Sequence, residues 1–418
     1  MIPVARPLLP DTDALLPYLR RIDATRIYAN WGPLNAELER RLGERFGAGI
    51  VTVSSATDGL TCALRAVLED RPADQRAGLC LMPSWTFVAS PQAALAAGLT
   101  PCFLDVDPAS WALTPELARA ELLAGLSRSG GLWRGMPVSA VMAVAPFGLQ
   151  LDAAAWDDFA ARTGIPVVID AAAAFDGLQV RKAPAVVSLH ATKTVAAGEG
   201  GFVATRDSDL ARRVKRVANF GFFGARLAEV PGTNAKLSEY HAAVALASLD
   251  GWDGRRGQWM SVGARLCAAL APHGVAFQED FAAGWIASMC MVRLPPGVRA
   301  AEAAMALGLS GVATRAWWGM GCHTSPAFEH FPRRASASGD VLAATAMLAE
   351  STLGIPFFTD LTDAEIATIA DAFAAMRRLA ASSQTGQAHA AVSVPSSLAA
   401  MRLVARDGQA RRARPAAN

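Results

Sequence analysis

Lysine is scarce in this chain. Only four of its 39 lysine and arginine residues are lysines, and they stand at positions 182, 193, 215 and 236. A lysine in a chemically favourable place is therefore more informative than an arginine would be. The six cysteines are scattered and form no CxxC pair, so the sequence indicates neither a zinc site nor a dithiol redox motif. Cys62, Cys80 and Cys102 lie in apolar runs, where we expect small core residues.

The chain also lacks a long apolar segment and a marked excess of charge. Its N-terminus has no basic region followed by an apolar run, and no segment is long enough to span a membrane. We therefore predict a cytoplasmic protein without a membrane role. The formal net charge is +2. Residues 381–418 hold five arginines and one aspartate, so the rest of the chain is close to neutral and gives no indication of nucleic-acid binding.

What the chain does have is apolar residues in short runs. With 418 residues, 52% of them hydrophobic, it can build a large core, and general disorder is excluded. The runs alternate with helical stretches such as 57–69 and 152–162, which is typical of an α/β layer. Because the runs are continuously apolar, we expect seven strands of a mainly parallel sheet that is buried on both faces. The seven runs are 50–54, 79–82, 101–106, 140–145, 166–170, 185–189 and 201–205.

Four parts are predicted along the chain. An N-terminal segment (1–30) precedes a large α/β domain (31–250). A smaller α+β domain (251–380) begins at the tryptophan-bearing stretch GWDGRRGQW. The tail (381–418) is rich in Ala, Ser, Gln and Arg and is predicted to be disordered. Its arginines could bind acidic surfaces, although a solvated tail is the simpler interpretation.

Four features follow predicted strands, at the edge where parallel sheets bind ligands. SSATDGL (54–60) can present N–H groups and a hydroxyl to an anion, or it can be only a helix cap. Asp170 ends a buried run, where a carboxylate needs a partner unless it caps the next helix. Lys193, in SLHATK (188–193), can be a desolvated amine suited to imine chemistry, or a surface lysine. GEGGF (198–202) is a flexible turn that lets backbone approach a ligand.

Three of these features together suit pyridoxal phosphate. That cofactor needs a lysine for its aldehyde, a carboxylate for its ring nitrogen and an anion site for its phosphate. The phosphate turn, Asp170 and Lys193 occur in the expected order along the chain. A carboxylate beside the ring nitrogen keeps that nitrogen protonated, and the lysine can then move a proton to and from the substrate.

The chain also resembles the DegT/DnrJ/StrS-type sugar aminotransferases, which have fold type I. The resemblance runs from about Asn30 to Leu379 and rests on seven stretches in order, since any one of them alone would be weak. The stretches are GPLNAELERRLGERFG (32–47), SSATDGLTCAL (54–64), PSWTFVASPQAALAAGLTPCFLDVDP (83–108), VVIDAAAAF (167–175), SLHATKTVAAGEGGFVAT (188–205), GTNAKLSEYHAAVALASL (232–249) and LGIPFFTDLT (353–362).

The resemblance implies a role for each matching residue. Lys193 would carry the cofactor as a Schiff base, and Asp170 would pair with the pyridine nitrogen. The further cofactor contacts it implies are Ala56, Thr57, Asp58 and Ser188 at the phosphate, Phe87 stacked on the ring, and Asn234 reaching the phosphate of the neighbouring subunit of a homodimer. The substrate contacts it suggests are His190, Arg315, Trp317, Trp318 and His323, for which packing is the competing interpretation. No metal site is predicted.

The predicted activity is transamination in two half-reactions. An amino acid, glutamate as in the family, would give its amino group to the cofactor, and a nucleotide-linked keto sugar or similar polyhydroxy ketone would then receive it. One alternative is a sugar dehydratase-like enzyme; such relatives have His in place of the lysine, so Lys193 favours transamination. Another is a cofactor-bound regulatory protein without turnover.

Three departures from the family pattern predict an atypical branch. Ala173 stands where the family has Gln in its DAAQ motif, a residue that supports the ring from its phenolic side. Asp176 intervenes before Gly177, where the family often has Gly directly after the motif. Lys236 replaces the more usual aromatic or Arg surroundings in GTNAK. The identity of the amino acceptor stays open at this point.

Overall fold

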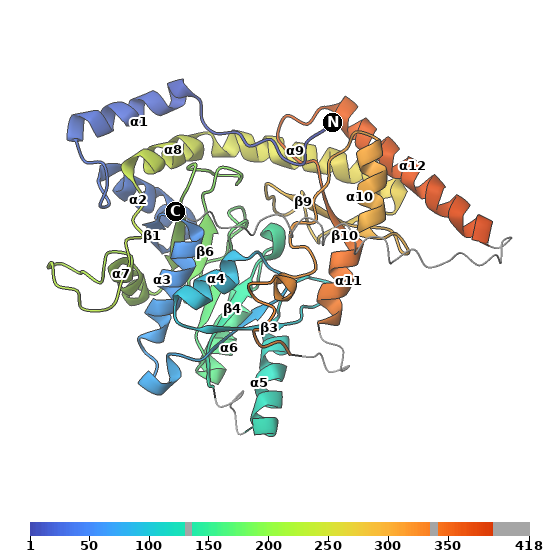
Figure 1. The fold of residues 1–418 in the computed structure, drawn as a ribbon. Coiled ribbons are helices and arrows are strands. Elements are labelled where there is room, and N and C mark those ends of the chain that lie inside the picture. The colour runs from blue at the N-terminus through green and yellow to red at the C-terminus, as the bar shows by residue number, and fades with distance from the viewer. Residues whose placement is uncertain (130–135, 335–341, 388–418) are drawn as a thin grey trace, which may run out of the picture. The chain divides into compact units, whose positions relative to one another are not determined.

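Seven strands form one sheet in the computed structural model, which describes residues 1–129, 136–334 and 342–387 (Figure 1). Their order across the sheet is β1-β7-β6-β5-β4-β2-β3. β7 runs antiparallel to β1 and β6, and all other neighbouring strands are parallel. The predicted mainly parallel seven-stranded sheet is therefore confirmed. The strands are β1 (Gly49–Val53), β2 (Leu79–Pro83), β3 (Thr100–Leu104), β4 (Val138–Val144), β5 (Val167–Asp170), β6 (Ala185–Ser188) and β7 (Gly201–Thr205).

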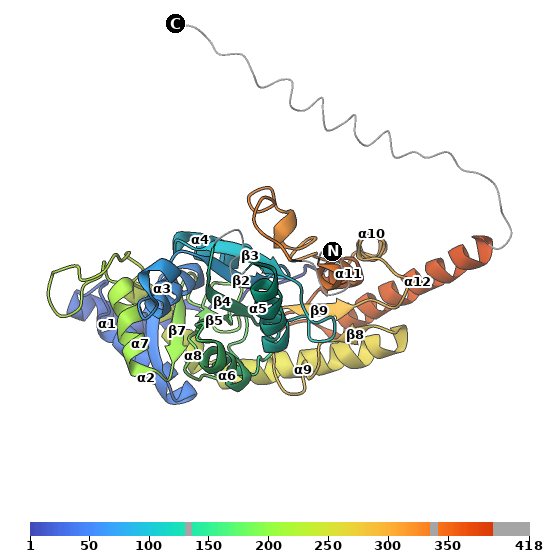
Figure 2. The ribbon, with the colours of Figure 1, turned by 90° about the horizontal axis from the view of Figure 1, so that it is seen from below.

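Helices on both faces of the sheet explain why its strands are unbroken apolar runs. Every residue of β2 and β7 is buried. α3 packs against α4 and against β5, β6 and β7, whereas α6 contacts β5 on the other side of the sheet from α4 (Figure 2). The helices up to residue 250 are α1 (Thr12–Thr25), α2 (Pro33–Phe46), α3 (Ala56–Leu68), α4 (Ala89–Ala96), α5 (Pro115–Ser129), α6 (Ala153–Thr163), α7 (Ser208–Val217) and α8 (Glu239–Asp250).

A second, smaller sheet follows the 19-residue helix α9 (Trp252–Leu270). It is antiparallel in the order β10-β9-β8, with β8 (Ala276–Phe277), β9 (Cys290–Arg293) and β10 (Thr352–Ile355). The remaining helices are α10 (Ala300–Leu309), α11 (Ala343–Ser351) and α12 (Asp363–Gln387). Residues Met1–Ala374 form one compact unit, and Ala375–Asn418 are grouped as a second. The division at residue 250 stays a prediction.

The structure adds detail at both ends of the described chain. The first residues pair with the smaller-sheet region: Ile2 bridges Val312, and the Phe357 N–H donates to the Val4 carbonyl over 3.0 Å. At the other end, α12 continues to Gln387, so the predicted tail begins with helical residues. The rest of that tail, 388–418, lies outside the described residues.

The parallel strands bring their carboxyl ends to one edge of the large sheet, and we call this the carboxyl edge. β1, β2, β5 and β6 all end there, and β7, which runs the other way, begins there. The four sequence features at strand ends therefore meet at this edge. Cys62, Cys80 and Cys102 are buried in the core, as expected from their apolar surroundings.

Candidate active site

Asp170 is the last residue of β5, and only 5% of it is exposed. One carboxylate oxygen, Oδ1, accepts from the Ala172 N–H over 3.1 Å, and the other, Oδ2, accepts from the Ser90 hydroxyl over 2.7 Å. Burial raises the pKa of Asp170, while Ser90, Ala172 and the charge of Lys193 act in the opposite direction. These two donors use about half of the acceptor positions of a carboxylate, so Asp170 can accept a further N–H.

Lys193 lies in the loop after β6, and its own N–H donates to the His190 carbonyl over 2.9 Å. Burial lowers the pKa of the Lys193 ammonium, and the Asp170 carboxylate partly opposes this shift. A lowered pKa raises the fraction of neutral amine, which is the form that attacks a carbonyl. The environment of Lys193 thus matches the desolvated lysine expected from sequence rather than a freely solvated one.

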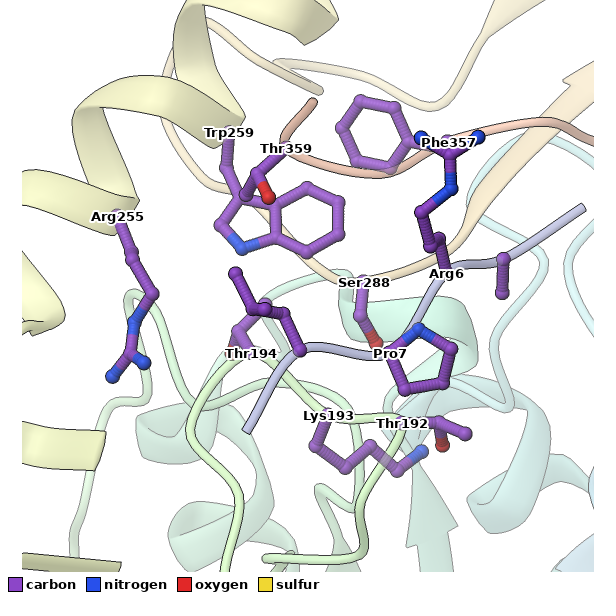
Figure 3. A pocket seen from close by; sticks show the side chains of 12 residues that line it. Arg6, Pro7, Thr192, Lys193, Thr194, Arg255, Trp259, Ser288, Phe357 and Thr359 are labelled. Atoms are coloured by element: carbon purple, nitrogen blue, oxygen red, sulfur yellow. The ribbon is translucent and has the colours of Figure 1, made fainter. Parts of the chain in front are cut away.

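The N-terminal segment passes over Lys193. A small cavity of about 20 Å³ lies between the two. Figure 3 shows Pro7 and Arg6 above Lys193, with Arg255 and Trp259 approaching from α9. Arg6 is held in place by Asp360, whose carboxylate it contacts over 2.7 Å. This contribution of the N-terminal segment was missed by the sequence interpretation, because no motif in residues 1–10 indicates where they pack.

The turn between β1 and α3 is where the sequence predicts an anion site. The Ser55 hydroxyl caps α3 by accepting from the Asp58 N–H over 3.1 Å, and the Asp58 carboxylate accepts from the hydroxyls of Ser54 and Ser55. The N–H groups of Ala56 and Thr57, in the first turn, have no partner within the helix and are suited to an anion. The Asp58 N–H is already used by the cap, which leaves Ala56 and Thr57 as the better phosphate donors.

Close packing holds this turn against its neighbouring strands. A Cβ atom at Gly201, where β7 begins, would lie 2.9 Å from the Ala56 nitrogen, so only glycine allows this approach. Ser188, at the end of β6, is 8% exposed, and its Oγ accepts from the His190 N–H over 3.2 Å. The Ser188 hydroxyl proton therefore remains available as a donor.

These residues fit pyridoxal phosphate. A buried carboxylate with spare acceptor positions suits the ring nitrogen, a lysine with lowered pKa suits the aldehyde, and a helix N-terminus suits the phosphate. Phe87, on the turn after β2, is 57% exposed and is free to contact a ring. Asn234 is exposed, and the neighbouring Ala235 carbonyl accepts from the Ser54 N–H over 2.8 Å, so this segment lies beside the phosphate turn of its own chain. The individual roles, including that of Asn234 across a dimer, stay predictions.

Two of the predicted substrate residues, His323 and Trp318, contact the turns after β2 and β4. His323 joins the carboxyl edge, because its Nδ1 lies 2.6 Å from the Ser84 hydroxyl oxygen, directly after β2. Burial lowers the pKa of His323, which favours the neutral ring. Trp318 also reaches this edge and stacks on Phe147, with 3.8 Å between ring centroids. Together they bring the segment that follows α10 to the carboxyl edge.

Of the other predicted substrate residues, Trp317 packs against the same aromatic cluster as Trp318, and His190 follows β6 at the carboxyl edge. The Arg315 backbone pairs with Gly354 of β10, and the Arg315 guanidinium lies 4.6 Å from the centre of the Trp317 ring. His190 is half exposed, its Nδ1 lies 2.9 Å from the Thr192 hydroxyl oxygen, and its Nε2 lies 3.6 Å from Glu199. Substrate contact by any of these residues stays a prediction.

Two hydroxyl groups behind Asp170 were not assigned a role from sequence. Ser90 is fully buried and donates to Asp170, and the Thr86 hydroxyl lies 2.7 Å from the Ser90 hydroxyl. Both occur in the stretch PSWTFVAS that carries the family resemblance, four residues apart. That spacing in a turn leading into a helix was the available signal, but it does not by itself identify the partner.

Among residues 1–129, 136–334 and 342–387, no group of three or more His, Cys, Asp or Glu side chains is placed to hold a metal ion. In the same described ranges, every helix is too short or too polar to cross a membrane.

Comparison with known proteins identifies the family that the chain resembles in sequence and fold. The sequence model of the DegT/DnrJ/EryC1/StrS aminotransferase family matches residues 11–374. Protein Rv3402c of Mycobacterium tuberculosis is 32% identical over 297 residues, 69% of each chain. The UDP-N-acetyl-3-dehydro-alpha-D-glucosamine 3-aminotransferase of Acidithiobacillus ferrooxidans is 28% identical over 88% of this chain and 95% of its own. The structure of DesI, solved in the presence of its TDP-sugar product, has a TM-score of 0.75 and 31% identity, covering 92% and 95% of the two chains.

Proposed function

Since the chain belongs to the DegT/DnrJ/EryC1/StrS aminotransferase family, we propose that it moves an amino group from an amino acid to the keto group of a nucleotide-linked sugar. The protein is an aminotransferase, and its cofactor is pyridoxal phosphate. The observation that carries the proposal is the pair at the carboxyl edge: Asp170 and Lys193 influence each other's pKa, and partial or full burial shifts the pKa of each toward its uncharged form.

The side chains of the site have separate tasks in this proposal. Bound pyridoxal phosphate supplies a ring that withdraws electrons from the substrate carbon. Lys193, as a neutral amine, takes a proton from the substrate carbon and delivers it to the cofactor carbon. Asp170 accepts a hydrogen bond from the ring N–H, and its negative charge stabilises the positive charge of the protonated ring nitrogen. The first-turn N–H groups of Ala56 and Thr57 bind the phosphate.

The substrates are inferred from relatives and from chemistry. The Acidithiobacillus protein is named for a UDP-linked 3-keto sugar, and DesI was solved with a TDP-sugar. A nucleotide-linked keto sugar is therefore the proposed acceptor, and glutamate is the proposed donor. We further propose a cytoplasmic homodimer in which Asn234 of one subunit contacts the phosphate bound by the other.

The donor half-reaction tests the proposal first. Glutamate added to the purified yellow protein should shift the cofactor absorbance to that of its amine form. UDP-linked 3-keto and dTDP-linked 4-keto sugars should then restore the original spectrum, each in proportion to the amino sugar formed. A protein whose spectrum glutamate leaves unchanged would instead support the cofactor-bound regulatory protein without turnover.

Subunit mixing tests the shared site. An Asn234→Ala chain mixed with a Lys193→Ala chain should regain one working site in each heterodimer, while both homodimers stay impaired. Mass spectrometry under native conditions confirms that heterodimers have formed. Heterodimers without activity would place Asn234 in its own subunit's site or outside any site.

A further inference from the structure

A hydrogen-bonded pair of hydroxyls on the turn after β2 supports Asp170, which ends β5, the second strand along from β2 in the sheet. The turn after β2 leads into α4, and the Ser90 N–H donates to the Phe87 carbonyl over 3.2 Å at the start of that helix. From there the Ser90 hydroxyl reaches Asp170 Oδ2 over 2.7 Å, and the Thr86 hydroxyl lies 2.7 Å from Ser90. Ser90 is 0% exposed and Thr86 is 1% exposed, so in the structure these three groups interact away from solvent.

We propose that Ser90, supported by Thr86, is a positioning residue that orients the Asp170 carboxylate toward the cofactor ring nitrogen and favours its charged form. This proposal rests on the proposed role of Asp170 in the aminotransferase reaction. In this proposal Ser90 contacts neither cofactor nor substrate and acts only through Asp170.

The protons available on these three groups determine the direction of the hydrogen bonds. An ionised carboxylate only accepts, so the Ser90 hydroxyl must donate to Asp170. The Ser90 oxygen then has its lone pairs free, and Thr86 can donate its proton to Ser90. The resulting order, Thr86 to Ser90 to Asp170, makes Ser90 a stronger donor, because donors in series polarise one another in a low dielectric.

The charge balance around Asp170 makes this donor important. Burial works against the ionised carboxylate, and among the described residues the charged group acting on it is Lys193, whose own ammonium is disfavoured by burial. When Lys193 is neutral, the hydrogen bonds from Ser90 and from the Ala172 N–H are what favour the charged carboxylate in the protein alone. Hydrogen bonds to a charged acceptor are about twice as strong as neutral ones.

The turn that carries the two hydroxyls is fixed from its other side. The Cys322 N–H donates to the Ser84 carbonyl over 2.8 Å, and Cys322 Sγ lies 3.1 Å from the Thr86 carbonyl. Ser84 also binds His323, as described above. Phe87 projects from the same turn, between Thr86 and Ser90. One rigid turn thus sets both the expected ring-stacking residue and the support of Asp170.

The test measures the titration of Asp170 itself in the protein without cofactor. Carboxyl-¹³C aspartate labelling gives a signal for each aspartate, and the signal missing in Asp170→Asn belongs to Asp170. Ser90→Ala should raise the pKa of Asp170 by about one unit, a tenfold change in proton affinity. Ser90→Cys, which fills the space and excludes a replacing water but donates only weakly, should raise it similarly. Ser90→Thr keeps the hydroxyl and should restore the wild-type value.

Two further variants separate this role from general packing. Thr86→Val should shift the pKa of Asp170 in the same direction but less, since it removes only the second donor. Ser84→Ala removes a buried hydroxyl from the same turn without touching Asp170, and should leave the Asp170 titration where it is. An Asp170 titration equal to wild type in both Ser90→Ala and Ser90→Cys would overturn the proposal.

The loaded protein gives a second reading. With ¹⁵N in the cofactor ring, the ring-nitrogen signal should move toward its unprotonated position in Ser90→Ala, because a more basic Asp170 competes for the shared proton. The titration without cofactor needs no turnover, so it can succeed even when glutamate converts nothing. A raised Asp170 pKa in Ser90→Ala without any conversion by glutamate would reject the proposed function and keep the positioning role. An unchanged Asp170 pKa with normal conversion by glutamate would reject only the positioning role.

Discussion

The two edges of the large sheet differ in what they bury. The edge opposite the carboxyl edge carries a groove of about 610 Å³ beside α3, α6 and α7. Charged side chains line it, but they are paired or solvated: Asp70 binds Arg213, and Asp157 accepts from the backbone N–H groups of Lys182 and Ala183. The cavity beside Lys193, at the carboxyl edge, has only about 20 Å³.

The displaced pKa values of Asp170 and Lys193, rather than the volume of a cavity, distinguish the carboxyl edge as the proposed reaction site. Asp170 and Lys193 both have pKa values displaced by burial, in opposite directions, which brings their proton affinities closer together. Such displaced values are costly to the fold and typical of reactive sites. The groove is larger, but it offers an incoming ligand mainly groups that water and ion pairs already satisfy.

The largest expected difference between the edges is in covalent chemistry. Lys193 lies at the carboxyl edge and Lys182 lines the opposite groove. Borohydride reduction of the yellow protein should fix the cofactor to Lys193 alone, and Lys193→Ala should abolish both fixation and turnover. Lys182→Ala is the matched control and should keep both. Peptide mass spectrometry locates the adduct, and an adduct on Lys182, Lys215 or Lys236 would show that the wrong lysine has been assigned.

The two edges also each hold a hydrogen-bonded aspartate, and these can be exchanged for asparagine in parallel. Asp170→Asn should leave the fold intact and slow glutamate-driven conversion at least about a hundredfold, because a neutral amide does not keep the ring nitrogen protonated. Asp157→Asn should leave that rate near wild type and cost about 1 kcal/mol of unfolding free energy, since it weakens two backbone hydrogen bonds. Single-turnover absorbance measurements compare the rates. A normal rate in Asp170→Asn would remove Asp170 from the mechanism.

The sequence predicted Asp170 and Lys193 for reasons that the structure makes clear. Both follow continuously apolar runs, and a buried strand that ends in a charged residue must place that charge at a sheet edge. The family resemblance added what each side chain would bind: the pyridine nitrogen of the cofactor for Asp170 and its aldehyde for Lys193. The match of fold and family is confirmed, and the assignment of each site residue still depends on the experiments.

Other features were beyond the sequence because their cause is not local. The run GFVAT is buried on both faces, so its pattern is the same in either direction and does not reveal that β7 is antiparallel. The N-terminal segment is held near Lys193 by contacts with residues far along the chain, including the pairing of Ile2 with Val312 and the ion pair of Arg6 with Asp360. Ser90 lies in the first turn of a helix, where serine is common, and its contact with Asp170 depends on the order β5-β4-β2 in the sheet, which brings the turn after β2 near the end of β5.

The pH dependence of the free energy of unfolding tests whether Asp170, at the carboxyl edge, has a raised pKa in the folded protein. The folded pKa of Asp170 is raised, so its contribution to folding is favourable below the ordinary carboxyl pKa of about 3.9 and is lost as pH rises through the raised value. In the protein without cofactor, Asp170→Asn should therefore gain stability over wild type as pH rises across that window. Urea unfolding at several pH values measures this. A stability difference that does not change with pH would mean that Asp170 has an ordinary pKa in the folded protein.

The smallest effect is expected where the groove is most exposed. The Asp70 side chain is 68% exposed, and its ion pair with Arg213 is of the surface kind that contributes between zero and about 1 kcal/mol. Asp70→Asn should therefore lower the melting temperature by no more than about 2 °C. Its glutamate conversion and sugar amination should equal those of wild type. Calorimetry and the two half-reaction assays check both statements. A severalfold loss of either half-reaction, with the melting temperature unchanged, would show that the groove takes part in function, and the contrast between the two edges would then no longer hold.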